Sequence, residues 1–228
     1  MVALPKLVPG SFVSRVNRFR AEVLVEGWPR SARVGSSGRM AELLVAGAEV
    51  YLAPAHRPGR LTDYDLLLVN HRGTLVSVDA HLPNRLWEEY LYRSGWQGQA
   101  VDNLRAEVQH GTSRLDFWLG QGPLHTWMEV KSVTLVREGM ALFPDAPTTR
   151  GARHASELTQ IAAAGGAAAI IFVVQRADAT VFTPHIEADP AFAAALRLAR
   201  QYGVTVCAYG CDVRLDTVTI AREMPVLC

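Results

Sequence analysis

The chain has few cysteines and no long hydrophobic run. Its three cysteines, Cys207, Cys211 and Cys228, are odd in number and lack the paired spacing of a zinc site. We therefore expect reduced thiols that pack inside a cytoplasmic protein, rather than a disulfide framework. The longest apolar run, 161–174, has 14 residues and contains two glycines. Because a bilayer span needs roughly 20 residues, and residues 1–10 show no signal peptide, we expect no membrane association.

The net charge is also small, at +1, and does not by itself indicate a nucleic-acid-binding protein. The first 40 residues nevertheless hold seven Lys or Arg against two acids. These basic residues, which include Arg18 and Arg20, could form a phosphate-binding surface, or they could simply lie on a solvated face. Lysine is rare, since only Lys6 and Lys131 stand beside twenty-one arginines. Arginine cannot easily replace a compact ammonium, so each lysine is a candidate for a specific role.

The pattern of the sequence changes near Pro83–Asn84. Before this point, short apolar or alternating segments are separated by turns rich in Gly, Pro and Ser, and these segments are 12–25, 43–53, 66–70 and 75–78. About five short strands in fewer than 80 residues indicate a small barrel. The sequence therefore predicts a β-barrel domain over 1–82 and a second domain over 83–228.

The second part alternates helical and strand patterns. Helices are predicted at 84–94, 149–164 and 189–202, and strands at 104–109, 114–119, 126–133, 167–174 and 204–209, the last being the final strand. Asp189-Pro190 is typical of a helix start and Gly203 of a helix end. The chain is therefore predicted to be an α/β (α+β) protein, with a barrel followed by a mixed sheet flanked by helices.

Charged residues gather on one face of the predicted three-strand meander. Alternation along residues 126–131 places Glu129 and Lys131 on the same face of their strand. If the hairpin before this strand is centred near Gly122–Pro123, Asp116 lies directly opposite Glu129. Side chains so paired have β-carbons roughly 5 Å apart.

The same counting extends to the preceding strand. A turn at 110–113 places Glu107 opposite Asp116, so three carboxylates form a row. Such a row is costly without a cation, because like charges repel and raise at least one pKa. Hard oxygen ligands suit Mg²⁺ or Mn²⁺. We therefore predict a metal ion between Asp116 and Glu129, with the backbone carbonyl of Val130 as a further ligand.

A metal in this position could activate water and stabilise charge on a phosphate, while Lys131 orients the water or neutralises the phosphate. The alternative is a surface ladder of salt bridges that includes Arg114 and the same acids. A second group follows on the next helix, where Arg150, His154 and Glu157 share one face. That face could contact phosphate or could simply be solvated, and Asp145 before it could be a helix cap or a site residue.

Several motifs resemble those of the sugar fermentation stimulation protein A family. They are Phe19-x-Ala-x-Val, Asn84-Arg85, residues 113–117, residues 129–134, the stretch Phe143-Pro-Asp-Ala-x-Thr-x-Arg-Gly151, His154-x-x-Glu157-Leu158, Asp189-Pro-x-Phe192-Ala and Gly203-Val204. The resemblance covers nearly the whole chain, and its most specific block is 129–158. It implies an N-terminal OB-fold and a C-terminal domain like the PD-(D/E)xK nucleases.

The resemblance also implies roles for single residues. Asp116, Glu129 and Lys131 occupy the positions of the catalytic nuclease motif, and Glu107 and Glu89 are the accessory acids. The family is described as binding DNA without marked sequence preference, with a proposed role in sugar (maltose) metabolism. One departure lies in the barrel, where the family usually has Pro-Asn-Thr-Gly and this chain has Gly35-Ser36-Ser37-Gly38. Ser36 and Ser37 can still contact phosphate.

Two functions therefore compete at the level of the sequence. In the first, the barrel holds a nucleic acid, DNA being the expected partner, and a Mg²⁺- or Mn²⁺-dependent site in the second domain cuts it. In the second, the same protein binds DNA without cutting it and has a regulatory role. The intact trio Asp116, Glu129 and Lys131 favours the enzyme. A sugar-sensing transcription regulator is disfavoured, because no helix-turn-helix pattern is present. The sequence leaves a homodimer open.

Overall fold

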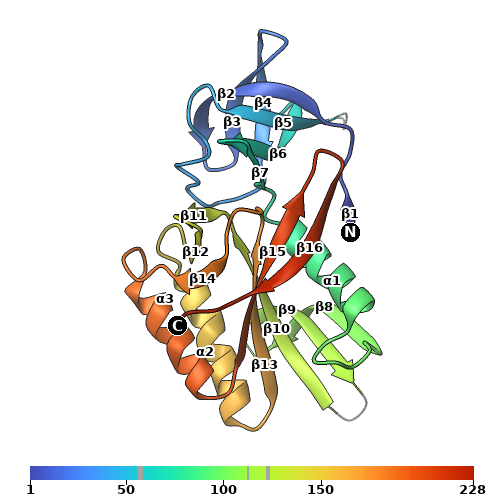
Figure 1. The fold of residues 1–228 in the computed structure, drawn as a ribbon, viewed down its shortest axis with the longest axis vertical. Coiled ribbons are helices and arrows are strands. Elements are labelled where there is room, and N and C mark those ends of the chain that lie inside the picture. Colours follow the sequence, from blue (N-terminus) through green and yellow to red (C-terminus); the bar gives the residue numbers. More distant parts are fainter. Residues whose placement is uncertain (56–58, 112, 122–123) are drawn as a thin grey trace.

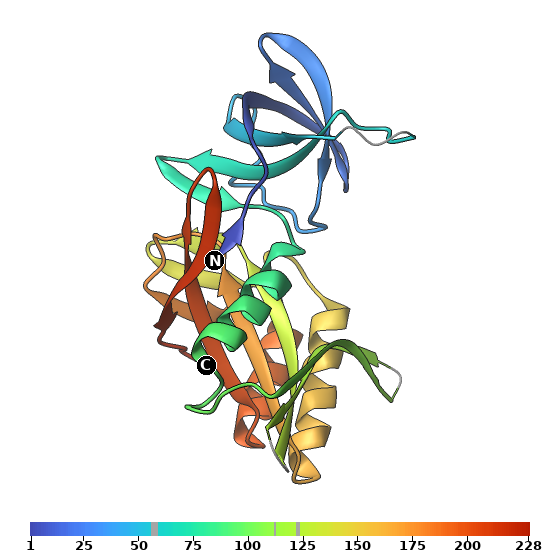
Figure 2. The same ribbon diagram turned by 90° about the vertical axis from the view of Figure 1, so that its right-hand side faces the viewer.

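The computed structural model describes residues 1–55, 59–111, 113–121 and 124–228. In it, a β-barrel stands at one end of a larger domain, in which a mixed sheet is flanked by helices (Figures 1 and 2). This arrangement confirms the predicted α+β architecture. The hairpin centre predicted at Gly122–Pro123 lies outside the described residues, as does Thr112 in the turn predicted at 110–113.

The first domain is a closed barrel of five described strands with a hairpin partner. The strands are β2 (Val8–Asn17), β3 (Arg20–Val25), β4 (Trp28–Val34), β5 (Glu49–Pro54) and β6 (Tyr64–His71), with β7 (Thr74–Ser77) paired to β6. The order β4-β3-β2-β5-β6 is antiparallel, and a parallel pairing of β4 with β6 closes the barrel. This is the strand order of an OB-fold. Alternation buries Ala21, Val23 and Val25 of β3 in its core.

The second domain is built on a sheet of described strands in the order β1-β16-β15-β13-β10-β9-β8. Their bounds are β1 (Val2–Ala3), β8 (Asn103–His110), β9 (Ser113–Gln121), β10 (Leu124–Val133), β13 (Ala167–Val174), β15 (Thr205–Val213) and β16 (Thr217–Met224). The three central strands β10, β13 and β15 run parallel. Every residue of β13 after the first is buried, as expected for a strand covered on both faces.

Helices cover both faces of this sheet. Their bounds are α1 (Leu82–Ser94), α2 (Thr149–Ala163) and α3 (Pro190–Gln201). On one face, Leu86 and Trp87 of α1 pack in a hydrophobic cluster with Met128 of β10. On the other face, Leu158 of α2 and Leu196 of α3 lie in a second cluster. Because α1 and α2 lie on opposite faces, the segments that lead into them flank the end of β10 from two sides (Figure 2).

Helix ends follow the sequence signals closely. Asp189 caps α3, since its Oδ1 accepts the backbone N–H of Phe192 at 2.9 Å. Its Oδ2 accepts the N–H of Thr148 at 2.7 Å, and Thr148 in turn caps α2 by accepting from Gly151 at 3.0 Å. Gly203, which follows α3, has φ +91°, a conformation that favours glycine. One carboxylate therefore ties the starts of α2 and α3 together.

Several elements differ from those predicted from the sequence. Strand 204–209 is not the last, because β16 follows it and pairs with it. The predicted strand 43–53 begins only at Glu49, since residues 41–44 form a turn. β4 and the small sheet of β11 (Leu135–Arg137), β12 (Met140–Phe143) and β14 (Val181–Pro184) were not predicted. Most of these strands are short or partly polar, so their strand state depends on distant partners.

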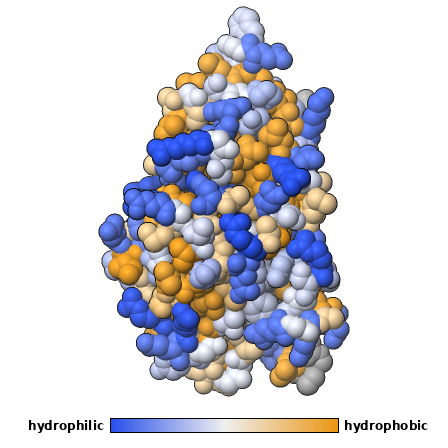
Figure 3. Space-filling model, in the orientation of Figure 1, coloured by the Kyte–Doolittle hydropathy of each residue, from blue (hydrophilic) through white to orange (hydrophobic). Residues whose placement is uncertain are grey.

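The N-terminus does not belong to the barrel. Val2 and Ala3 pair with Val218 and Thr217 of β16, at the edge of the second sheet. The predicted boundary after residue 82 stays a proposal, although the last barrel-associated strand ends at Ser77. Within the described ranges, no helix is long and apolar enough to cross a membrane. The cysteines are free, and Cys211 is buried. Figure 3 shows hydrophobic residues interspersed with hydrophilic ones on this face of both domains.

Candidate functional site

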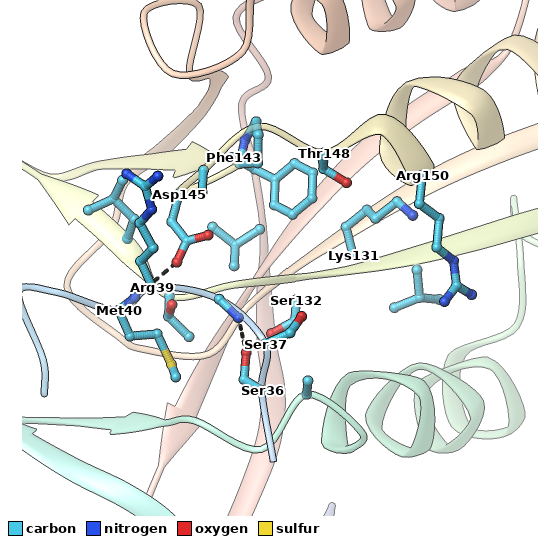
Figure 4. Close-up of a pocket in the computed structure, with 18 of the residues that line it drawn as sticks. Ser36, Ser37, Arg39, Met40, Lys131, Ser132, Phe143, Asp145, Thr148 and Arg150 are labelled. Atoms are coloured by element: carbon cyan, nitrogen blue, oxygen red, sulfur yellow. Dashed lines mark hydrogen bonds between the residues drawn. The ribbon is translucent and has the colours of Figure 1, made fainter. Parts of the chain in front are cut away.

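A cleft of ≈ 1100 Å³ lies between the barrel and the second domain. The barrel contributes Arg15, Asn17, Arg18 and residues 36–40 to its lining, and the second domain contributes the start of α1, the end of β10, residues 142–148 and Arg150. Figure 4 shows side chains from both domains pointing into it. The positions of the predicted catalytic residues can therefore be described relative to this cleft.

The strand register beside the cleft is the predicted one. Met128 of β10 pairs with Phe117 of β9, so the next positions along the two strands are Glu129 and Asp116. On the other side of β9, Ala106 pairs with Phe117 and Val108 with Leu115, which sets Glu107 beside Asp116. Counting residues across the two hairpins therefore gave the correct alignment.

The backbone ladder between β9 and β10 ends at Met128, and a side chain continues it. Asp116 Oδ2 accepts the backbone N–H of Val130 at 2.8 Å. In a strand, the N–H and C=O of one residue point toward the same neighbour. The carbonyl of Val130 therefore points to the side where Asp116 lies, as its predicted role as a ligand requires.

Asp116 is held from a second direction by the first turn of α1. Asn84 donates a hydrogen bond from Nδ2 to Asp116 Oδ1 at 2.9 Å. Burial and, next to it, the nearby charge of Glu129 together raise the pKa of Asp116 to about 6, against the lowering effects of Val130, Asn84 and Lys131. The protein alone therefore stabilises the negative charge of ionised Asp116 poorly.

Glu129 is 2 % exposed and lies in the midst of cationic and polar partners. Its Oε1 accepts from Lys131 Nζ at 2.5 Å and is hydrogen-bonded to Nδ1 of His154. Burial acts to raise the pKa of Glu129, but the Lys131 ammonium and His154 outweigh it, so the pKa is lowered. The other oxygen, Oε2, is buried and has no hydrogen-bond partner among the residues that the structure describes. One carboxylate oxygen is thus left free beside Asp116.

Lys131 shares the face of Glu129, as predicted, and its side chain is only 12 % exposed. Glu107 does not join the carboxylates. It binds Arg114 at 2.6 Å between Oε2 and Nε, and both side chains are more than half exposed. In the described part of the chain, no group of three or more His, Cys, Asp or Glu side chains is arranged to hold a metal. Instead of the predicted row of three carboxylates, the structure therefore has a pair, Asp116 and Glu129, while Glu107 is bound by Arg114.

The predicted role of Glu89 as an accessory acid has no support from its position. Its Oε2 binds the N-terminal ammonium of Met1 at 2.5 Å and Arg93 at 3.4 Å. Glu89 lies one position away from the face of α1 that begins at Asn84, and it does not line the cleft. On a helix, the residue four positions after Asn84, rather than five, shares its face.

The predicted contact of His154 with nucleic acid has no support from its position either. This side chain is 1 % exposed and is bound to Glu129, so it supports the carboxylate from within. Glu157 on the same helical face accepts the hydroxyl of Ser113 at 2.5 Å. Only Arg150 of this group lines the cleft. The face of α2 is neither a solvated surface nor a row of phosphate contacts.

On the barrel side, Arg18, Ser36 and Ser37 line the cleft, as does Arg114 from the second domain. Arg20 does not, because it lies on the outward face of β3, where its neighbours Ala21 and Val23 point into the barrel. Its predicted contact with nucleic acid is therefore not supported by its position. Asn84 is a site residue that the sequence does not single out for a role, and its position in the first turn of the predicted helix is the one signal for it.

Comparisons with known proteins agree with this two-domain arrangement. Residues 81–217 match the model of the sugar fermentation stimulation protein RE domain, and residues 13–78 match the SfsA N-terminal OB domain. The chain belongs to the sugar fermentation stimulation protein family. This confirms the resemblance found in its motifs and the OB-fold of the barrel. The OB domain supports nucleic-acid binding at the level of the fold.

Relatives cover the whole length of the chain. A sugar fermentation stimulation protein homolog of Moorella thermoacetica is 46% identical over 231 residues, covering 100% of this chain and 99% of the relative. The homolog of Desulforamulus reducens is 44% identical and covers 99% of this chain and 94% of the relative. The structure of Pyrococcus furiosus SfsA in complex with Ca²⁺ matches with a TM-score of 0.90 and 28% identity, covering 100% and 98% of the two chains.

Proposed function

We propose that this protein binds DNA in the cleft between its domains and cuts it at a Mg²⁺- or Mn²⁺-dependent nuclease site. The observation that carries the proposal is the meeting of Asp116, Glu129 and Lys131 at the cleft, with the N–H of Val130 fixing one carboxylate. Two carboxylates and a lysine beside phosphate-binding side chains suit phosphodiester hydrolysis.

The residues present fit a divalent cation. Glu129 Oε2 is buried and has no partner in the described ranges of the chain. Asp116 is close enough to Glu129 for that charge to add to the effect of burial in raising the pKa of Asp116. These two carboxylates and the carbonyl of Val130 are hard oxygen donors, and they would hold Mg²⁺ or Mn²⁺ with water completing the coordination. A bound ion would supply a water of lowered pKa and stabilise negative charge on the phosphate.

A cation-binding site on this fold also has support from a relative. The Pyrococcus furiosus SfsA structure was solved in complex with Ca²⁺ and aligns with the whole of this chain. Calcium prefers the same kind of oxygen ligands as Mg²⁺, although in a larger and more flexible shell. The shared fold therefore supports a site for a hard divalent ion, and the proposal assigns it to Asp116 and Glu129.

The other side chains of the cleft would bind and orient the strand. Lys131 presents its ammonium beside Glu129 and would neutralise the phosphate that is cut or orient the attacking water. Arg150 at the start of α2 and Arg18 on the barrel would contact phosphates on either side. Buried His154 would keep Glu129 in place without touching the nucleic acid. The choice of DNA and a role in sugar metabolism come from the family alone.

A DNA-binding protein without catalysis is the second candidate. The specific observation in its favour is the pairing of Glu107 with Arg114, which leaves two carboxylates rather than three at the centre. In that case the barrel and the arginines of the cleft would bind DNA without marked sequence preference, and the role in sugar metabolism would be regulatory.

The decisive experiment incubates purified protein with labelled single- and double-stranded DNA in Mg²⁺, Mn²⁺ or EDTA. We expect cleavage with either metal, none with EDTA, and none by Glu129→Ala with either metal. Both forms should still bind DNA, because the barrel is unchanged. Wild type that binds every substrate and cuts none would support the second candidate. Cleavage that survives Glu129→Ala and Lys131→Ala together would indicate a contaminating nuclease and would contradict the site.

A further inference from the structure

Glu107 of β8 has two alternative partners on β9. The strand register places Asp116 directly opposite Glu107, whereas Arg114, which is paired with Gln109, is its diagonal neighbour. Directly opposed residues have β-carbons about 5 Å apart, and diagonal neighbours lie about 7–8 Å apart. Glu107 nevertheless binds the diagonal neighbour, through a contact of 2.6 Å between its Oε2 and Nε of Arg114. The carboxylate therefore takes the more distant of the two partners.

The charges around Asp116 explain this choice. Asp116 already lies beside Glu129, whose charge helps burial to raise the pKa of Asp116. A third carboxylate at this point would add to the repulsion, because like charges at short distance oppose ionisation. Arg114 has the opposite effect, since its guanidinium forms a charge-assisted hydrogen bond with the Glu107 carboxylate. As long as no cation lies between the acids, the pair with Arg114 is therefore the favoured state of Glu107.

The backbone is also irregular at Glu107. Its φ is +58°, a conformation that residues other than glycine rarely adopt. Among the positive-φ residues other than glycine in the described ranges, Glu107 is the one that lies within a strand, whereas the others lie in turns or connecting segments. Irregularities in a strand change the direction of a side chain, often next to an active site. The strand is thus distorted at the residue whose side chain has two alternative partners.

The pair of Glu107 and Arg114 is open to the cleft and can be exchanged. Both residues line the cleft, and their side chains are 52% and 64% exposed. An ion pair so exposed to water contributes little free energy, because the solvent screens it. Phosphate competes well for the same guanidinium, since arginine can bind phosphate oxygens through two parallel hydrogen bonds. A nucleic acid that enters the cleft can therefore take Arg114 from Glu107.

The proposed cation site has few protein ligands of its own. Its acidic ligands are Asp116 and Glu129, and within the described ranges no group of three or more His, Cys, Asp or Glu side chains is arranged to hold a metal. Mg²⁺ and Mn²⁺ prefer about six oxygen ligands. Glu107 is the acid that the register places next to Asp116. Once it is freed from Arg114, its carboxylate would supply a further hard oxygen ligand.

We infer that Glu107 and Arg114 form a latch, which the phosphate of a bound nucleic acid opens. Phosphate takes the guanidinium of Arg114, and the freed carboxylate of Glu107 turns to Asp116 as a third acidic ligand of the cation. This inference rests on the proposed function and adds that the substrate itself completes the cation site. Without nucleic acid, two carboxylates hold the cation weakly. The closed latch therefore explains why the structure has a pair of acids at the centre of a nuclease site.

The first test is a double-mutant cycle on the affinity for Mn²⁺ without DNA, measured by titration calorimetry. Arg114→Ala opens the latch, so this variant should bind Mn²⁺ about tenfold more tightly than wild type. Glu107→Gln and the double variant lack the third carboxylate, and both should stay within about threefold of wild type. Tighter binding in the double variant as well would show that only the loss of a positive charge matters. That result, or unchanged binding in Arg114→Ala, would overturn the latch.

The second test measures DNA affinity by fluorescence anisotropy, with Ca²⁺ or with EDTA. The factor by which Ca²⁺ tightens DNA binding equals the factor by which DNA tightens Ca²⁺ binding. This gain should be about tenfold larger in wild type than in Glu107→Gln or Arg114→Ala. Arg150→Ala is the matched control, because it removes another arginine of the cleft, and it should weaken binding but keep the wild-type gain. An undiminished gain in Glu107→Gln, or a lost gain in Arg150→Ala, would overturn the latch.

The same measurements separate the latch from the proposed function. Thermal unfolding checks that each variant folds, as expected for substitutions at an exposed ion pair. If the affinities follow the predicted pattern but wild type cuts no DNA, catalysis is wrong and the latch is supported. If wild type cuts DNA while Mn²⁺ affinity follows charge alone, the nuclease is supported and the latch is overturned. Absence of Mn²⁺ binding in all four proteins of the cycle would overturn the cation site and the latch together.

Discussion

The two sides of the cleft hold their charges in opposite ways. On the side of the second domain, Glu129 is buried and Asp116 is half-buried. Burial and the charge of Glu129 raise the pKa of Asp116, whereas the Lys131 ammonium acts against burial and lowers the pKa of Glu129. On the barrel side, Arg18 and Ser37 are exposed, and Arg15 fixes the backbone around them rather than their side chains. The side chains of the second domain are therefore fixed around one point, whereas those of the barrel are free to contact phosphates at several positions.

This difference has a direct consequence for substitutions. Removing a buried charge leaves its partner uncompensated, which costs several kcal/mol. Removing one exposed arginine costs a single screened contact with phosphate, and neighbouring contacts remain. Effects should therefore be large and specific on the side of β10, and small and dependent on salt on the side of the barrel.

The largest difference is expected between Glu129→Gln and Arg18→Ala. Glu129→Gln removes the charge that would hold the cation, so metal-dependent cleavage should fall by at least about 1000-fold. Arg18→Ala should change cleavage by less than about tenfold, through weaker binding. Initial rates under saturating Mn²⁺ measure both, with thermal unfolding as the control for folding. Equal losses in the two variants would remove the distinction between the two sides.

A smaller effect is expected when Lys131 is replaced. Lys131→Ala removes one electrostatic group but no proposed ligand, so the rate of cleavage at saturating DNA should fall by about 100-fold. Affinity for Mn²⁺ should stay within a few-fold of the wild-type value. Lys131→Arg is the matched variant and should recover part of the rate, because it restores the charge but not the compact ammonium. Loss of metal affinity in Lys131→Ala would show that this side chain organises the site rather than the phosphate.

The pH dependence of the free energy of unfolding should report the raised pKa of Asp116. Its pKa is raised from 3.8 to about 6, so the stability it contributes is fully present below 3.8 and is lost as pH rises through about 6. Asp116→Asn cannot ionise. Without metal, its free energy of unfolding relative to wild type should therefore increase by up to about 3 kcal/mol between pH 4 and pH 8. Denaturant unfolding in EDTA measures this, and a difference that does not change with pH would contradict the assignment.

The smallest effect is expected on the barrel. Arg18 lines the cleft and Arg20 does not, although both lie in the same hairpin. Arg18→Ala should lower the slope of log affinity against log salt by about one, the value for one lost phosphate contact. Arg20→Ala should leave that slope unchanged. Anisotropy titrations at several salt concentrations measure both slopes. An equal change in both variants would place the bound strand along the outside of the barrel as well.

Much of the fold was predictable because local patterns decide it. The run of residues 167–174 is apolar throughout and became the central strand, and the signals at Asp189 and Gly203 marked the ends of α3 correctly. β4 was missed because it begins Trp28-Pro29-Arg30-Ser31, which is not an apolar pattern. Its strand state depends on pairing with β3 and β6, and no local rule reports a partner so far along the chain.

The site was predictable only along the hairpins. Short turns fix which residues face each other, so counting was sufficient to align Asp116 with Glu129. Contacts made by helices could not be counted in this way. Asn84 reaches Asp116 from 32 residues away, and His154 reaches Glu129 from 25 residues away. These contacts depend on how α1 and α2 pack on the sheet. Glu89, whose role came from the family resemblance, likewise lies one residue off the face of α1 that approaches β9, which only the packing of the helix shows.

The central claim is that Asp116 and Glu129 form a cation site on the buried side of the cleft. Titration calorimetry with Mn²⁺ at neutral pH tests it most directly, with wild type, Glu129→Gln and the matched control Glu107→Gln, which removes an exposed carboxylate bound to Arg114. We predict saturable binding of Mn²⁺ to wild type and to Glu107→Gln, and its loss in Glu129→Gln. Absence of binding to wild type, or unchanged binding to Glu129→Gln, would contradict the claim.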